Sequence, residues 1–199
     1  MGITQRDDKL HTYAKYMPWP DDVRYELIDG VAYLMHLPAQ TLEHQDFAGE
    51  IYFQVRQTLV GNPCRVFIAP LDVRLPKANK MDGLIDTVVQ PDILVVCDPT
   101  KLYRKYGVRG APDFAVEVLS PSTASLDHVL KRRAYECAGV REYWLVDPTD
   151  RIVTIYRLDN GEFGKPEVCQ LSGETPVGVL PGVAIAWDDL TSRIPQPDW

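Results

Sequence analysis

The chain has 199 residues, of which 45% are hydrophobic and 25% charged, an ordinary balance for a globular protein with a full core. Its formal net charge of -7 shows no basic excess of the kind that marks a nucleic-acid-binding surface, although a local basic cleft can coexist with an acidic exterior. No apolar run approaches the roughly 18 residues that a membrane helix needs, so we expect no membrane partner.

The four cysteines (Cys64, Cys97, Cys137 and Cys169) are far apart and form no CxxC pair. Zinc-site spacing is therefore absent, and a domain of this size does not need disulfides for its stability. We interpret these cysteines as free, mostly buried thiols, and we expect the protein to be cytoplasmic.

The first predicted element is a β-hairpin over residues 24–36, in which Asp29-Gly30 joins two apolar-rich runs. Apolar residues then recur at helical spacing from Gln40 to about Leu59. Asn62-Pro63 follows this stretch and ends the predicted helix.

Three strands are predicted next, each bounded by proline or polar turn residues: "CRVFIAPLDVRLP" (64–76), "VVQPDILVVCDP" (88–99) and "PDFAVEVLSP" (112–121). Residues 77–87 between the first two strands are typical of a loop or lid. The basic stretch 101–111 is a polar connection or a short helix.

The strongest helix pattern follows in "STASLDHVLKRRAYECAG" (122–139), where a Ser or Thr caps the start and Gly139 ends the helix. Its apolar stripe is predicted to contain Leu126, Val129, Leu130 and Cys137. Two strands, "REYWLVDP" and "RIVTIYRL", come next, and short strands and turns occupy the last forty residues. This order indicates a mixed α/β (α+β) fold with a central sheet.

Two acidic residues lie within the predicted strands. Strand alternation places Glu117 on one face with Leu119, while Asp92 shares a face with Leu94. If the registers agree, Asp92 and Glu117 lie within metal-bridging distance, and two such carboxylates need a proton or a cation between them. Oxygen ligands suit a hard divalent ion. The alternatives are that Asp92 caps a turn and that Glu117 pairs with a buried Arg or hydroxyl.

Asp127, Lys131 and Tyr135 fall at i, i+4 and i+8 of the helix that leaves the Glu117 strand. In isolation this pattern is an exposed ion pair worth about 0.3–0.5 kcal/mol. Because the helix begins at the end of that strand, Lys131 can instead reach the carboxylate pair and stabilise developing negative charge.

Taken together, "YELIDG", His44, "PDILVV", "PDFAVEVLSPST", the Asp127–Lys131–Tyr135 series and "GVREYWLVDP" resemble the Uma-type family of restriction-endonuclease-like proteins, within the PD-(D/E)XK nuclease superfamily. The resemblance covers about Tyr25 to Tyr156. It implies a restriction-endonuclease-like domain over residues 1–199, with a nuclease core at about 40–148 and additional C-terminal strands at 151–190.

The resemblance also implies an active site. Asp92 and Glu117 take the two acidic positions and hold Mg²⁺ (or Mn²⁺) together with the backbone carbonyl of Val118. The usual lysine of the superfamily would stand at Leu119, and the family pattern supplies it from the next helix as Lys131. The implied function is metal-dependent hydrolysis of phosphodiester bonds in DNA, by a homodimer because duplex cleavage requires two sites.

The family pattern includes Glu26 and His44 as site-lining residues, although His44 is equally well a surface or capping histidine. Asp72 is a further candidate that is as easily structural. Basic side chains that could meet a phosphate backbone, or simply be solvated, are Lys101, Arg104, Lys105 and Arg109. Two other functions stay open at this point: a nuclease-like binding or regulatory module without turnover, and a hydrolase of a small phosphoester.

Overall fold

The structure is a computed structural model of the chain, and it describes residues 5–20, 23–35 and 41–194. The N-terminal part contains a short helix, α1 (Tyr13–Tyr16), and the predicted hairpin of β1 (Tyr25–Ile28) and β2 (Val31–Leu34). Asp29 and Gly30 both have positive φ, 53° and 85°, as a two-residue type I′ turn requires. The hairpin prediction is therefore confirmed.

The larger sheet has the order β12-β11-β10-β9-β6-β3, with β13 also paired to β11. Its strands are β3 (Arg65–Ile68), β6 (Ile93–Val96), β9 (Phe114–Val118), β10 (Glu142–Asp147), β11 (Ile152–Asp159), β12 (Glu162–Phe163) and β13 (Glu167–Gln170). The pairs β3–β6 and β6–β9 are antiparallel, and β9–β10 is parallel. The second and third predicted strands thus extend an antiparallel meander that begins with β3, and β10, which follows the second helix, adds parallel to β9.

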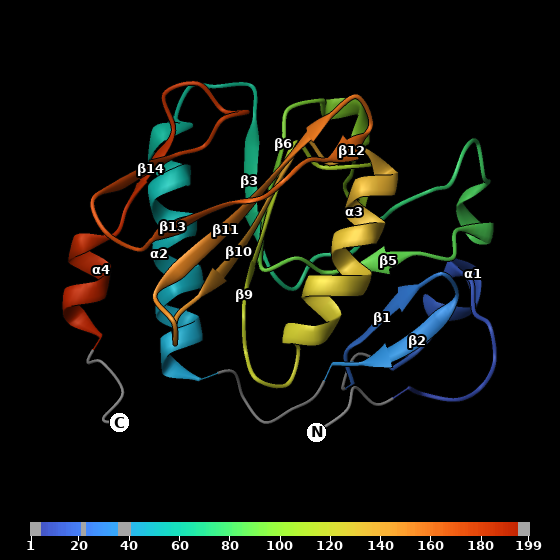
Figure 1. The fold of residues 1–199 in the computed structure, drawn as a ribbon. Coiled ribbons are helices and arrows are strands. Elements are labelled where there is room, and N and C mark those ends of the chain that lie inside the picture. Colours follow the sequence, from blue (N-terminus) through green and yellow to red (C-terminus); the bar gives the residue numbers. More distant parts are fainter. Residues whose placement is uncertain (1–4, 21–22, 36–40, 195–199) are drawn as a thin grey trace.

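Two helices cover opposite faces of this sheet (Figure 1): α2 (Leu42–Thr58) on one side and α3 (Arg132–Ala138) on the other. Val116 and Val118 of β9 pack into the core on the α2 side, while Ala115 packs with Tyr135 on the α3 side. Because side chains alternate along a strand, Glu117 lies on the α3 side of the sheet.

A second sheet has the order β2-β1-β5-β4-β8-β7. Its remaining strands are β4 (Val73–Arg74), β5 (Val88–Val89), β7 (Leu102–Tyr103) and β8 (Gly107–Arg109), and a separate pair is formed by β14 (Glu174–Pro176) and β15 (Ala184–Ala186). The short helical elements are η1 (Asp82–Leu84), η2 (Pro99–Lys101), η3 (Leu126–Lys131) and α4 (Asp188–Arg193).

Two of the predicted strands are each divided between the two sheets. The first contains β3 and β4, separated by the Ala69-Pro70 cis peptide bond, and the second contains β5 and β6, separated by Gln90-Pro91. Proline has no N–H to donate to a ladder, so each strand stops there and the chain crosses to the other sheet. The prediction of two continuous strands is wrong at these prolines.

The basic stretch 101–111 also differs from expectation, since it contains the β7–β8 hairpin and no helix beyond Lys101. The segment 77–87 forms the η1 turn, and its Asp82 makes ion pairs with Arg74 and Arg109. These ion pairs hold the segment against β4 and β8.

The predicted helix at 122–139 is present but not uniform. It begins with η3, a π-helix, continues as α3, and ends at Gly139 with φ of 88°. Leu126 is buried as expected, but Val129 is 60% exposed and Cys137 is exposed. The apolar stripe was wrong because it assumed α-helical spacing, whereas the wider π-helical turn rotates the following residues. At the start of η3, Ser125 makes no side-chain capping bond.

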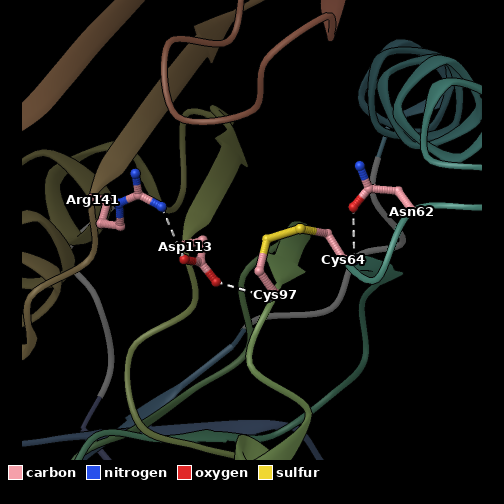
Figure 2. The surroundings of a disulfide bond; sticks show 5 residues. All are labelled: Asn62, Cys64, Cys97, Asp113 and Arg141. Carbon is pink, nitrogen blue, oxygen red and sulfur yellow. Dashed lines mark hydrogen bonds and ion pairs between the residues drawn. A yellow bond between two sulfur atoms is a disulfide. The ribbon is translucent and has the colours of Figure 1, made fainter.

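The cysteine prediction is also wrong, because Cys64 and Cys97 form a disulfide (Figure 2). Arg65 pairs with Val96 in the β3–β6 ladder, so the same register brings the next two residues, Cys64 and Cys97, opposite each other. Sequence spacing carries no information on this register. Of the other two thiols, Cys137 is exposed and Cys169 partly exposed, so neither is buried.

In the part of the chain that the structure describes, no helix combines the length and the apolar character needed to cross a membrane.

Candidate active site

The two acidic strand residues face each other across neighbouring strands. Ile93 of β6 pairs with Val116 of β9 in antiparallel register, and continuing this register by one residue places Asp92 opposite Glu117. Both carboxylates are buried. The registers of β6 and β9 therefore agree, which was the condition under which the sequence placed Asp92 and Glu117 close together.

The backbone of Val118 joins this pair. Its N–H donates to Oδ2 of Asp92 at 2.9 Å. In a strand the N–H and C=O of one residue point to the same side, so the Val118 carbonyl also points toward the Asp92 strand. Two carboxylates and one carbonyl thus converge at the end of β9.

His44 reaches the same place from the opposite face of the sheet. It lies in the first turn of α2, where the Thr41 hydroxyl accepts a hydrogen bond from the His44 backbone N–H at 3.1 Å. The His44 side chain is buried, and its Nε2 lies 3.2 Å from Asp92 Oδ2. His44 is therefore part of the site and not a surface residue.

Lys131 occupies the centre of the cluster. Its ammonium nitrogen lies 2.5 Å from Glu117 Oε1, 3.1 Å from Glu26 Oε1 and 3.4 Å from Asp127 Oδ1. Only 1% of the residue is exposed. Lys131 therefore reaches the Glu117 carboxylate from the following helix, as the position of the helix suggested.

Glu26 comes from β1 of the second sheet, so the site lies where the two sheets meet. Its Oε1 also accepts a hydrogen bond from the backbone N–H of Gln90 at 2.6 Å. Its other oxygen, Oε2, is buried and has no hydrogen-bond partner among the described residues. The same holds for Nδ1 of His44.

Two tyrosines complete the buried network. Tyr135 donates its hydroxyl proton to Glu117 Oε1 at 2.8 Å, and Tyr143 donates to the backbone carbonyl of Asp127 at 3.2 Å. Burial, reinforced by the Glu117 charge, raises the pKa of both tyrosines well above its usual value. Both hydroxyls therefore stay protonated and act as donors.

The site holds more negative than positive charge. Glu26, Asp92, Glu117 and Asp127 are buried around a single lysine. Burial raises the pKa of Glu117 well above its usual value, and burial also raises the pKa of Asp127 to about 6. Burial alone would lower the pKa of Lys131, but the surrounding carboxylates outweigh it and raise that pKa, so the ammonium stays charged. The cluster thus favours an additional cation.

The other predicted residues lie outside this cluster. Asp72 accepts hydrogen bonds from Tyr16 and Gln90, whose backbone in turn binds Glu26. Among the four basic candidates, Lys101 donates to the Ala111 carbonyl and Arg109 donates to Asp82, whereas Arg104 and Lys105 are exposed.

Sequence reasoning missed Gln90 and Tyr143. It also missed Thr123, whose backbone carbonyl accepts a hydrogen bond from the Asp127 N–H at 3.0 Å. Gln90 acts through its backbone N–H, which any residue except proline could supply. Its position two residues before Asp92 was the one available signal.

A bound divalent ion fits this donor set. Among the described residues, no three His, Cys, Asp or Glu side chains already form a metal-ligand group. Mg²⁺ does not require one, because it is usually held by one or two carboxylates and keeps several waters. The excess of buried negative charge and the unpartnered Glu26 oxygen both suit a cation and its waters.

The α2–meander–α3–strand order is the one that the family resemblance implies, and Asp92 and Glu117 lie at its central strands with Lys131 beside Glu117. A family model described as "Uma2: Putative restriction endonuclease" matches residues 13–188. The chain belongs to this family.

The fold is shared with a crystal structure described as "a putative nuclease belonging to DUF820" from Anabaena variabilis ATCC 29413. The TM-score is 0.69 and the sequence identity 20%, and the match covers 91% of this chain and 97% of the other. At this identity the likeness establishes the fold alone. A search of curated proteins found no match.

Proposed function

We propose that the protein is a divalent-metal-dependent endonuclease that hydrolyses phosphodiester bonds in DNA. The observation that carries this proposal is the buried cluster of four carboxylates and one lysine, in a chain that belongs to the Uma2 family. One lysine cannot neutralise four carboxylates, whereas a divalent ion supplies the missing charge.

Asp92, Glu117 and the Val118 carbonyl would hold Mg²⁺ or Mn²⁺. Held there, such an ion would supply polarisation of the phosphate and a lowered pKa for an attacking water. The Val118 N–H and His44 orient Asp92, and Tyr135 orients Glu117 through its hydrogen bond.

Lys131 has the electrostatic role. The carboxylates keep its ammonium group charged inside a site from which bulk water is largely excluded. A fixed positive charge there stabilises the negative charge that develops on the phosphate during hydrolysis. Removal of a single such donor typically lowers kcat by about 100- to 1,000-fold.

Nicking of supercoiled plasmid DNA tests the proposal, with Mg²⁺, Mn²⁺ or EDTA. We expect nicking with either ion, none in EDTA, and none with the isosteric variants Asp92→Asn and Glu117→Gln. Asp113→Asn is the matched control, because Asp113 lies just before β9, at the opposite end of that strand from Glu117. Nicking by Glu117→Gln at the rate of the control would refute the proposal.

The second candidate function is a nuclease-like binding module without turnover. It is favoured by one observation: Lys131 is fully engaged by three carboxylates of its own chain. Titration calorimetry with Mn²⁺ separates the two functions. A nuclease binds Mn²⁺ in a manner that depends on Glu117, whereas a binding module of this kind shows no carboxylate-dependent uptake of metal.

The proposal includes a homodimer, because cleavage of both strands of a duplex requires two sites. Analytical ultracentrifugation with and without a DNA duplex measures the state directly. A dimer on DNA supports double-strand cleavage, and a monomer that nicks one strand would refute the homodimer.

A further inference from the structure

A cleft of about 740 Å³ lies beside the active site and has no role in the proposed mechanism. Its volume is within the range of about 300–1,000 Å³ that is usual for small-ligand pockets. Its aromatic lining consists of Tyr13, Tyr16, Trp19, Tyr25 and Tyr106. Ring contacts join Tyr13 to Tyr16, Tyr16 to Trp19, and Trp19 to Tyr25 with centroids 5.2 Å apart, so these four rings form a connected aromatic surface.

The polar side of the cleft is a hydrogen-bonded group. The Gln90 side chain donates to Asp72 Oδ1 at 2.8 Å and accepts from Arg24 Nε at 3.0 Å. Tyr16 also donates to Asp72 Oδ1, at 3.1 Å. The second oxygen of Asp72, Oδ2, accepts no hydrogen bond from the described residues, so the cleft offers an acceptor held in place by its neighbours.

The same group connects the cleft to the active site. The Gln90 backbone N–H binds Glu26 Oε1, and Glu26 binds Lys131. Gln90 is also only two residues from Asp92, which limits the distance between their Cα atoms to about 7 Å. Gln90 therefore belongs both to the wall of the cleft and to the surroundings of the active-site carboxylates.

We propose that this cleft binds one unpaired nucleobase of the DNA strand, next to the phosphate that is cleaved. This inference rests on the proposed function. The aromatic wall stacks on the base, which suits any base because every base has a π-face. Asp72 Oδ2 accepts a hydrogen bond from an N–H on the base edge, as carboxylates do in base recognition.

The charges around the cleft fit a nucleotide. Lys105 lines it, is exposed, and lies 5.5 Å from the Tyr106 ring centroid. Arg24 also lines the cleft, with its Nε held by Gln90. These two cations can meet the phosphates that flank the bound base.

The experiment measures binding by fluorescence anisotropy in EDTA, where no cleavage occurs. Three duplexes serve as probes: one with a single bulged adenine, one with an abasic residue at the same bulge, and one fully paired. We expect the adenine bulge to bind about 5- to 150-fold more tightly than the abasic bulge, the range that stacking of one base gives.

Two variants test whether the preference for the adenine bulge comes from the cleft. Tyr106→Ala and Asp72→Asn should each remove most of the preference for adenine over the abasic residue. Tyr103→Ala is the matched control, because Tyr103 and Tyr106 belong to the same β7–β8 hairpin region and are both 41% exposed, but Tyr103 does not line the cleft. Its preference should equal that of the wild type, and thermal unfolding checks that all three variants fold.

Equal affinity of the wild type for the adenine and abasic bulges would overturn the inference. So would a preference that Tyr106→Ala and Asp72→Asn retain in full. Plasmid nicking is scored separately: a preference that depends on Tyr106 without any nicking supports the cleft and refutes the nuclease. Nicking without the preference supports the nuclease and refutes the cleft.

Discussion

Substitution of Lys131 by methionine should destabilise the protein strongly, and the loss should depend on pH. Lys131 is the single lysine among Glu26, Glu117 and Asp127, all of which are buried. Methionine has a similar length but no charge, so the three carboxylates would lose their shared partner. Breaking a buried ion pair by removing one partner costs about 3–5 kcal/mol.

The pH dependence gives a second estimate of this cost. At pH 7 the carboxyl groups of the unfolded chain have lost their protons. To stay folded at this pH, the variant must take up a proton on at least one of the three buried carboxyl groups. For a glutamate of ordinary pKa near 4.3, this costs about 3.7 kcal/mol, since one pH unit corresponds to about 1.36 kcal/mol. At pH 5 the same protonation costs only about 1 kcal/mol. The folded variant binds more protons than the unfolded chain, so its stability falls as pH rises.

Urea unfolding at pH 5 and pH 7 measures both values. Lys77→Met is the control, because Lys77 also pairs with an acidic residue, Asp29, but on the surface. Its loss should be within about 1 kcal/mol at either pH. A cost for Lys131→Met below about 1 kcal/mol at pH 7, or one that does not change with pH, would refute the view that this ammonium holds the carboxylates together.

Three further predictions concern other parts of the same account. Glu117→Gln should be at least as stable as the wild type at pH 7, because burial raises the pKa of Glu117 and an amide removes the cost of burying its charge. Binding of Mn²⁺, measured by calorimetry, should nevertheless disappear in this variant, and retained binding would contradict the assignment of Glu117 as a ligand. Asp127→Asn should gain up to about 3 kcal/mol at pH 7 in urea unfolding. The pKa of Asp127 is raised from 3.8 to about 6, so the stability of the wild type falls as the pH rises from about 4 to about 6. The same dependence of stability on pH in the variant would exclude Asp127 as its cause. Reduction of the disulfide between Cys64 and Cys97, which are 33 residues apart, should lower the free energy of unfolding by about 2–4 kcal/mol. A stability unaffected by reductant would contradict a structural role of this bond. Rapid alkylation of cell extracts shows whether the bond exists in the predicted cytoplasmic environment.

Local patterns predicted the elements that surround the site because they depend on neighbouring residues alone. The Asp29-Gly30 turn and the α2 stripe that contains Phe47 and Ile51 are of this kind. The prolines at 70 and 91 were visible, but the presence of a second sheet that receives the chain there was not. That arrangement depends on contacts with β1, which lies far away in the sequence.

Within the site, the spacing of Asp127, Lys131 and Tyr135 predicted a shared helix face, and the start of the helix at the end of the Glu117 strand predicted that this face reaches the carboxylates. Asp127, Lys131 and Tyr135 are buried, although the π-helical turn made the companion prediction for Val129 and Cys137 wrong. Residues four apart stay close to the same face in an α-helix and in a π-helix. A stripe counted over three turns, in contrast, moves to another face when the helix type changes.

The partners of the site residues could not be predicted in the same way. His44 contacts Asp92 from the first turn of α2, and Glu26 binds Lys131 from another sheet. These contacts depend on how the elements pack. The family resemblance supplied both residues as candidates, while their atoms and distances came from the fold.

The most direct test of the central claim is a crystal structure of the protein soaked in Mn²⁺, with the ion located by its anomalous signal. The account predicts one ion bound to the Asp92 and Glu117 carboxylates and the Val118 carbonyl, with the Lys131 ammonium group beside the site. A carboxylate cluster that stays free of Mn²⁺ at saturating concentration, with Lys131 still shared among Glu26, Glu117 and Asp127, would contradict it.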